Sequence, residues 1–184
     1  MAEKNLPFTP SQLTEIIRQY PTPFHIYDEA AIRQNVRNLL AAFAWAPQFK
    51  EYFAVKATPN PSILKVLREE GVGADCSSLA ELILAERSGI DGENIMFSSN
   101  DTPAAEFRLA SEMGVLINLD DITHIDFLAA NGGIPKTVCL RFNPGGEFLL
   151  GNTIMGNPGE AKYGMTREQL SEGVKKLMSL GATE

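Results

Sequence analysis

Residues 52–76 read YFAVKATPNPSILKVLREEGVGADC and contain the pattern that decides the fold. The apolar residues 52–55 predict a short buried strand, because strands of a parallel sheet are apolar on both faces. Pro61 favours the start of a helix and Gly71 favours its end, so residues 61–70 predict a helix. Residues 72–76 then predict a second strand. The order strand, helix, strand is that of one βαβ unit in a parallel sheet.

The same unit recurs along the chain, with strand centres near residues 54, 74, 96, 117 and 139. Further strands are predicted at 95–98, 115–119 and 137–142, each followed by an amphipathic helix. Two architectures share this alternation. An open doubly wound sheet can be completed by five strands, whereas a (β/α)₈ barrel needs eight strands and about 250 residues. The local pattern favours neither, although the Gly-x-Gly-x-x-Gly fingerprint of a dinucleotide fold is absent after the first strand.

Before this region the sequence predicts two helices and a short strand. Thr9 and Gln12 have the spacing of a capping box, which favours a helix that Pro21 ends. Residues 24–27 predict a strand, and Asp28 is a favourable N-cap for the second helix.

Composition narrows the classes of partner. The chain has 184 residues and a formal charge of −7, which argues against nucleic acid or an anionic membrane as the main partner. No apolar run approaches the ~20 residues that span a bilayer. The start lacks the apolar stretch of a secretion signal, and the two cysteines lie at no metal-ligand spacing. We therefore expect a reduced, cytoplasmic protein without a metal.

Polar residues gather directly after the predicted strands. In either architecture the carboxyl ends of parallel strands build the functional site, so these residues are candidates for it. They are Lys56, Asp75, Ser77, Ser98 to Asn100, Asp120, Arg141 and Asn143.

Lys56 is the sharpest candidate, because it follows an apolar strand between the small residues Ala54 and Ala57. Partial burial would lower the pKa of its amine and favour a Schiff base with a carbonyl group. The alternative is a solvated lysine that only ends a strand. Asp75 and Arg141 either form an ion pair across this edge or each orient a ligand group. Glu81 has the spacing of a capping-box glutamate after Ser78.

Five segments resemble the alanine-racemase-like pyridoxal-phosphate enzymes. Residues 52–57 with Asn60 are similar to the family's cofactor-lysine segment, and GADCSSLAEL at 73–82 has its Asp with a Glu six residues later. The others are LRFNPG at 140–145, AKYGM at 161–165 and PFHIYD at 23–28.

The resemblance implies a (β/α)₈ TIM barrel of the alanine-racemase-like type, truncated here to about five βα units. Residues 29–184 would form an incomplete pyridoxal-phosphate-binding barrel domain. Residues 1–28 would belong with a C-terminal β domain in a full enzyme, which would act as a homodimer. As given, the chain is expected to be inactive and poorly stable, with an exposed edge strand at 137–142.

The resemblance also implies the site. Lys56 would be the catalytic residue and would hold pyridoxal 5'-phosphate covalently. The other implied cofactor-binding residues are Asp75, Arg141, Glu81 and Ala54, with Asn100 and Asn143 near the site. No metal is expected.

Within the family, the motifs are closest to those of enzymes that decarboxylate meso-diaminopimelate to lysine. The cofactor would accept the electrons left by departing carbon dioxide. Alternatives are an ornithine, arginine or carboxynorspermidine decarboxylase, a racemase, or a non-catalytic pyridoxal-phosphate-binding protein. An unrelated open α/β binding domain is a further possibility that the residues leave open.

Overall fold

The computed structural model describes residues 6–146 and 163–184. Within them one sheet contains five parallel strands, hydrogen-bonded in the order β1-β2-β3-β4-β5. A doubly wound sheet reverses its strand order at a switch point, whereas a barrel adds each strand beside the previous one. The observed order is therefore the barrel order, which confirms the predicted fold class. The strands are β1 (Tyr52–Ala54), β2 (Gly73–Cys76), β3 (Ile95–Ser99), β4 (Leu116–Leu119) and β5 (Val138–Leu140).

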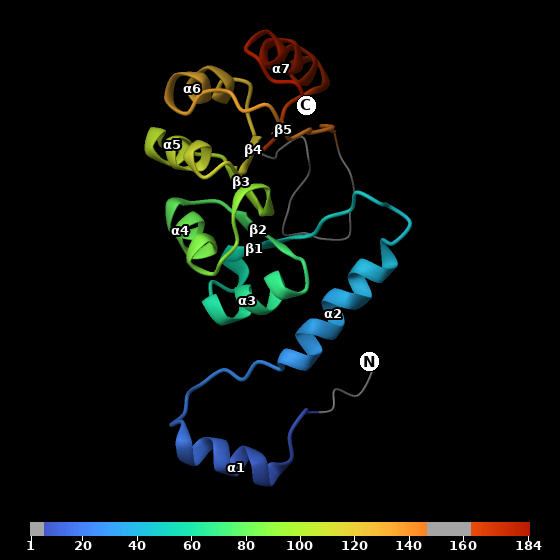
Figure 1. The fold of residues 1–184 in the computed structure, drawn as a ribbon, viewed down its shortest axis with the longest axis vertical. Coiled ribbons are helices and arrows are strands. Elements are labelled where there is room, and N and C mark those ends of the chain that lie inside the picture. Colours follow the sequence, from blue (N-terminus) through green and yellow to red (C-terminus); the bar gives the residue numbers. More distant parts are fainter. Residues whose placement is uncertain (1–5, 147–162) are drawn as a thin grey trace.

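The connecting helices lie along the outside of the curved sheet, as Figure 1 shows. Each buries at least two residues and begins near a residue that favours helix starts. For example, the Asn60 side chain accepts a hydrogen bond from Ser62 N, and Pro61 takes the first position of that helix. The Ser78 side chain likewise accepts a hydrogen bond from Glu81 N. These helices are α3 (Pro61–Glu69), α4 (Leu79–Arg87), α5 (Ala104–Glu112), α6 (His124–Asn131) and α7 (Arg167–Ser179). Two short 3₁₀ turns, η1 (Val55–Ala57) and η2 (Gly92–Asn94), flank the strands.

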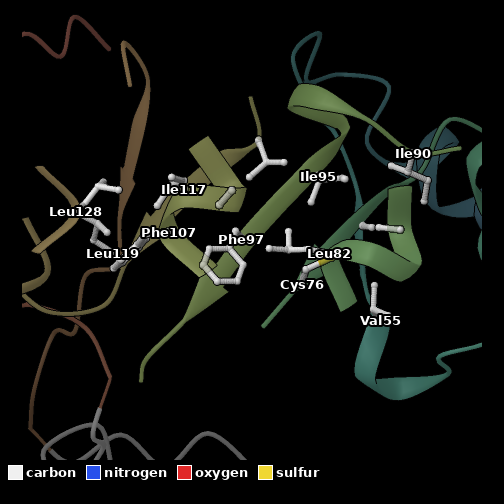
Figure 2. Packing of buried hydrophobic residues seen from close by; sticks show 14 of the residues in the cluster. Val55, Cys76, Leu82, Ile90, Ile95, Phe97, Phe107, Ile117, Leu119 and Leu128 are labelled. Atoms are coloured by element: carbon white, nitrogen blue, oxygen red, sulfur yellow. The ribbon is translucent and has the colours of Figure 1, made fainter. Parts of the chain in front are cut away.

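The main core fills the space between the sheet and these helices (Figure 2). Phe97 from β3 and Phe107 from α5 meet edge to face at 6.3 Å between ring centroids, and both are buried. Cys76 lies in the same core, where burial raises the pKa of its thiol to about 12. Each fully buried large side chain contributes about 1.5–3 kcal/mol to folding. The core therefore holds the strand ends in a fixed register.

Two helices precede the sheet, α1 (Pro10–Gln19) and α2 (Glu29–Ala42). The predicted capping box of α1 is present, with Thr9 and Gln12 bonded to each other's backbone N–H. Helix α1 lies apart from the sheet in Figure 1, and none of its described residues is buried.

Helix α2 packs on α3 through an apolar cluster around Val36 and Leu67, and through four charged side chains that we call the α2–α3 clasp. Glu70 accepts two hydrogen bonds from Arg37, at 2.7 and 2.8 Å, and one from Arg33 at 3.0 Å. Arg33 also pairs with Glu69. The clasp fixes α2 against the outer helical layer.

Two strand predictions differ from the structure. Residues 24–27 form no strand, since no described segment lies beside them to complete a hydrogen-bond ladder. The strand predicted at 137–142 is shorter, and Phe142 instead forms an isolated parallel bridge with Met165. Among the described helices, none has the length and apolar character needed to cross a membrane.

Candidate functional site

The carboxyl ends of the strands surround a cavity of about 360 Å³, which we call the rim cavity. Its volume lies within the range of about 300–1,000 Å³ typical of ligand pockets. Seven of its eight lining residues are among those predicted from their position after a strand. The lining residues are Lys56, Asp75, Ser77, Ser98, Asn100, Asp120, Arg141 and Tyr163.

Lys56 lies in η1, which follows β1 directly. Val55 beneath it is fully buried, and Thr58 N donates to Val55 O at 3.1 Å, so the core anchors this turn. Lys56 itself is exposed, and it forms no ion pair with the described residues. The burial that the sequence predicted for this amine is therefore not supplied by residues 6–146 and 163–184.

Asp75 lies next to the end of β1, because the strand register pairs it with Ala54. Its Oδ1 atom is buried and has no hydrogen-bond partner in the described chain. Burial raises the pKa of this carboxyl, while the Ser98 side chain and the charges of Lys56 and Arg141 act in the opposite direction. Asp75 thus presents an unsatisfied acceptor beside Lys56, the one lysine among the described residues that line the rim cavity.

Arg141 pairs with Asp120, so the sequence-based option of an Asp75–Arg141 ion pair is wrong. The Arg141 Nε atom lies 3.1 Å from Asp120 Oδ1, and Nη1 lies 3.3 Å from Oδ2. The register explains this choice: Leu119 of β4 pairs with Leu140 of β5, so the next residues along both strands are neighbours. Asp75 is on β2 and acts on Arg141 at longer range.

Residues 163–165 close one side of the rim cavity. The Tyr163 ring centroid lies 5.9 Å from Arg141 Cζ, and Asn143 Nδ2 donates to Tyr163 O at 2.9 Å. Gly164 N donates to Asp120 O at 3.1 Å. Gly164 has a φ of +89°, and an added Cβ would lie 3.0 Å from Asn143. This segment therefore requires glycine at position 164.

Sequence reasoning did not single out Tyr163 as a site residue. The signal was available, because Tyr163 lies inside the 161–165 segment that carries the family resemblance. Residues 161 and 162 of that segment lie outside the described residues.

Glu81 supports the cavity from behind without lining it. Its carboxylate accepts from Ser77 N at 2.9 Å and from Ser77 Oγ at 3.2 Å. The capping interpretation is half correct: Ser78 Oγ caps α4, but the Glu81 carboxylate binds the N–H of Ser77 and not that of Ser78. Asn100 lines the rim cavity, whereas Ala54 and Asn143 do not line it but contact lining residues: Ala54 pairs with Asp75, and Asn143 donates to Tyr163 O.

The fold and the rim cavity define a parallel α/β barrel domain with a lysine, two aspartates and an arginine at the strand ends. This chain belongs to the pyridoxal-dependent decarboxylase family, whose pyridoxal binding domain matches residues 29–182. The family resemblance and the pyridoxal cofactor class predicted from the sequence are therefore confirmed.

Named relatives agree with this assignment. The chain is 42% identical over 170 residues to Protein TabA of Pseudomonas amygdali pv. tabaci. That alignment covers 92% of this chain and 39% of TabA. It is 33% identical over 173 residues to the diaminopimelate decarboxylase of Zymomonas mobilis, covering 91% and 41%. The chain thus spans about two fifths of the length of these curated relatives.

A solved structure also matches. The diaminopimelate decarboxylase of Helicobacter pylori complexed with L-lysine aligns with a TM-score of 0.77 and 27% identity. The alignment covers 88% of this chain and 42% of the H. pylori chain.

Proposed function

We propose that this chain is the cofactor-binding part of an amino-acid decarboxylase, and that Lys56 holds pyridoxal phosphate covalently through its amine. The observation that carries the proposal is that Lys56, Asp75 and Arg141 line one cavity in a domain of this family. A lysine amine is the group that condenses with the aldehyde of pyridoxal phosphate. The role of Lys56 follows from that chemistry.

The residues around the cavity fit this cofactor. Asp75 Oδ1 is a buried acceptor without a partner among the described residues, and it suits an O–H or N–H group of a ligand. Arg141 would donate to the phenolic oxygen of the cofactor, because a guanidinium has donors beyond the two that contact Asp120. Ser98 and Asn100 add neutral polar groups to the wall of the same cavity.

Bound pyridoxal phosphate supplies an electron sink that makes loss of carbon dioxide from an amino acid feasible. The chain's own residues would bind the cofactor and orient it. Lys56 would hold the cofactor through its amine and keep it at the strand ends, within reach of a substrate amine. The Asp75 carboxylate would attract the Lys56 ammonium, and Glu81 would keep Ser77 in place in the cavity wall.

For the substrate, we propose meso-diaminopimelate, with lysine as product. Relatives named diaminopimelate decarboxylase from Zymomonas mobilis and Methanothermobacter thermautotrophicus, at 33% and 31% identity, support this choice. The complete enzyme would be a cytoplasmic homodimer, and residues 1–28 would pack with its β domain.

A different amino-acid substrate is the second candidate, because not every relative carries the diaminopimelate name. TabA is the relative at 42% identity, and another at 28% is L-glutamyl-[BtrI acyl-carrier protein] decarboxylase of Niallia circulans. Ornithine, arginine and carboxynorspermidine therefore belong in the substrate panel. A non-catalytic binding protein would keep Lys56 and act on none of them.

The test is reductive labelling of the complete protein. Pyridoxal phosphate followed by borohydride should leave a pyridoxyl group on Lys56, located by peptide mass spectrometry. Lys56→Arg keeps the charge but removes the condensing amine, so its label should vanish. Lys65→Arg, at an exposed position on α3, is the matched control and should keep the label. Label on another lysine, or retained label in the Lys56 variant, would contradict the proposal.

Product analysis then separates the substrates. Release of carbon dioxide from meso-diaminopimelate, with lysine formed, supports the first choice. Turnover of ornithine, arginine or carboxynorspermidine alone supports the second. Labelling at Lys56 without turnover of any amino acid would leave a cofactor-binding protein.

A further inference from the structure

Asp120 is buried at the rim cavity, yet the proposed function gives it no part. We propose that Asp120 is a positioning residue that holds the Arg141 guanidinium in one orientation, so that the remaining N–H groups of Arg141 meet an anionic oxygen of pyridoxal phosphate. The inference rests on the proposed function, because it requires that cofactor in the rim cavity.

The contact between the two side chains fixes both position and rotation. Arg141 Nη1 donates a hydrogen bond to Asp120 Oδ2 at 3.3 Å, and in the same ion pair Nε lies 3.1 Å from the other carboxylate oxygen, Oδ1. A planar guanidinium that hydrogen-bonds one carboxylate oxygen and lies against the other has less freedom to turn than one with a single contact. A single contact would leave that rotation free.

The constraint runs from Asp120 to Arg141, because Asp120 is the better anchored of the two. Its side chain is 4% exposed, whereas that of Arg141 is 40% exposed. Asn118 Nδ2 donates to Asp120 Oδ1 at 3.1 Å, and Gly164 N donates to the Asp120 carbonyl at 3.1 Å. A buried carboxylate tied at both its side chain and its backbone orients the longer, more exposed arginine.

The Tyr163 ring lies near the guanidinium, 5.9 Å from Arg141 Cζ. Arginine has five N–H donors, and Asp120 contacts two of its nitrogens. Within residues 6–146 and 163–184 no other carboxylate forms an ion pair with Arg141. Apart from its contacts with Asp120, the Arg141 guanidinium therefore has donors that no described residue accepts from, and the proposal assigns these to the ligand.

The test measures cofactor affinity in the complete protein by absorbance titration with pyridoxal phosphate. Asp120→Asn keeps the shape of the side chain but removes its charge, and should weaken binding roughly tenfold or more, the usual cost of disturbing a hydrogen bond to a charged group. It should also shift the absorbance maximum of the bound cofactor. In an Arg141→Ala background the same change should alter affinity by less than about twofold, because the two residues act as one unit.

Asp126→Asn is the matched control. It makes the same exchange in an ion pair with Lys176, where Asp126 is 71% exposed, and neither Asp126 nor Lys176 lines the rim cavity. Affinity and absorbance maximum should both stay at the wild-type values. An equal loss from Asp120→Asn in both backgrounds, or no loss with Arg141 present, would overturn the inference.

A second variant covers the case in which Asp120→Asn fails to fold. Asn118→Ala removes the amide that steadies the Asp120 carboxylate and leaves the charge in place. We expect a smaller loss of affinity, present with Arg141 and absent in the Arg141→Ala background. No loss, or the same loss in both, would overturn the inference. Absence of label on Lys56 in the wild-type protein would instead contradict the proposed function.

Discussion

The rim cavity and the α2–α3 clasp each contain two basic and two acidic side chains, but they arrange those charges differently. In the clasp every charge has a partner: Arg33 and Arg37 converge on Glu70, and Arg33 also pairs with Glu69. At the rim, Arg141 and Asp120 pair, whereas Lys56 and Asp75 form no ion pair with described residues.

The difference separates structural charges from functional ones. In the clasp, hydrogen bonds from Arg37 and Arg33 lower the pKa of Glu70, so this paired carboxylate supports the fold at neutral pH. The buried carboxyl of Asp75 has a raised pKa and an unsatisfied oxygen, which costs stability unless a ligand supplies a partner. Perturbed groups of this second kind are typical of functional sites.

The largest effect should come from Asp75→Asn. Loss of the carboxylate should weaken pyridoxal phosphate binding by about 1.5–3 kcal/mol, the cost of a hydrogen bond to a charged group, as measured by titration. The same change should raise the melting temperature of the cofactor-free protein at pH 7. Burial raises the pKa of Asp75 in the folded chain, so its ionised form destabilises the fold at neutral pH.

The pH dependence of that gain provides a check. At a pH below 3.8, the ordinary pKa of aspartate, Asp75 is protonated in both the folded and the unfolded chain. The gain in melting temperature from Asp75→Asn should therefore disappear there. A variant that melts lower than wild type at pH 7 would show that Asp75 stabilises the fold.

Glu70→Gln should have an intermediate effect confined to the fold. Hydrogen bonds from Arg37 and then Arg33 lower the pKa of Glu70 to about 2. Its contribution to stability is therefore complete above 4.5 and is lost as the pH falls toward about 2. We expect the variant to melt a few degrees below wild type at pH 7, with the gap closing in acid. Cofactor labelling at Lys56 should not change. A loss of labelling in this variant would show that the clasp also affects the rim cavity.

The smallest effect should come from Asp126→Asn. Its ion pair with Lys176 measures 2.6 Å but is exposed on both sides. Exposed pairs contribute about 0–1 kcal/mol, so the melting temperature should stay close to that of wild type. A drop as large as that of Glu70→Gln would show that pairing alone, without partial burial, is sufficient to stabilise the outer helices.

The sequence predicted the sheet well because its signal is local. Apolar strands such as residues 52–55 alternate with helices that end at glycines such as Gly71, and this alternation sets parallel strands and outer helices. The short strand expected at 24–27 was wrong, because a strand depends on a neighbour that the local pattern does not reveal.

The sequence predicted which residues gather at the site, but not which of them contact one another. Parallel topology sufficed to gather Lys56, Asp75 and Arg141 around one cavity. Which carboxylate Arg141 contacts depends on strand register, and the pairing of Leu119 with Leu140 selects Asp120. The exposure of Lys56 likewise depends on what packs above the strand end, which no local pattern encodes.

Gly164 shows how a missing side chain can shape a site. Its φ of +89° strains any other residue, and an added Cβ would lie only 3.0 Å from Asn143. In a saturation library of this chain, position 164 should accept glycine alone, while its neighbour Tyr163 stays open to other aromatic residues. Comparing the residues tolerated at positions 163 and 164 would then show which part of the cavity wall depends on backbone conformation and which on side-chain shape.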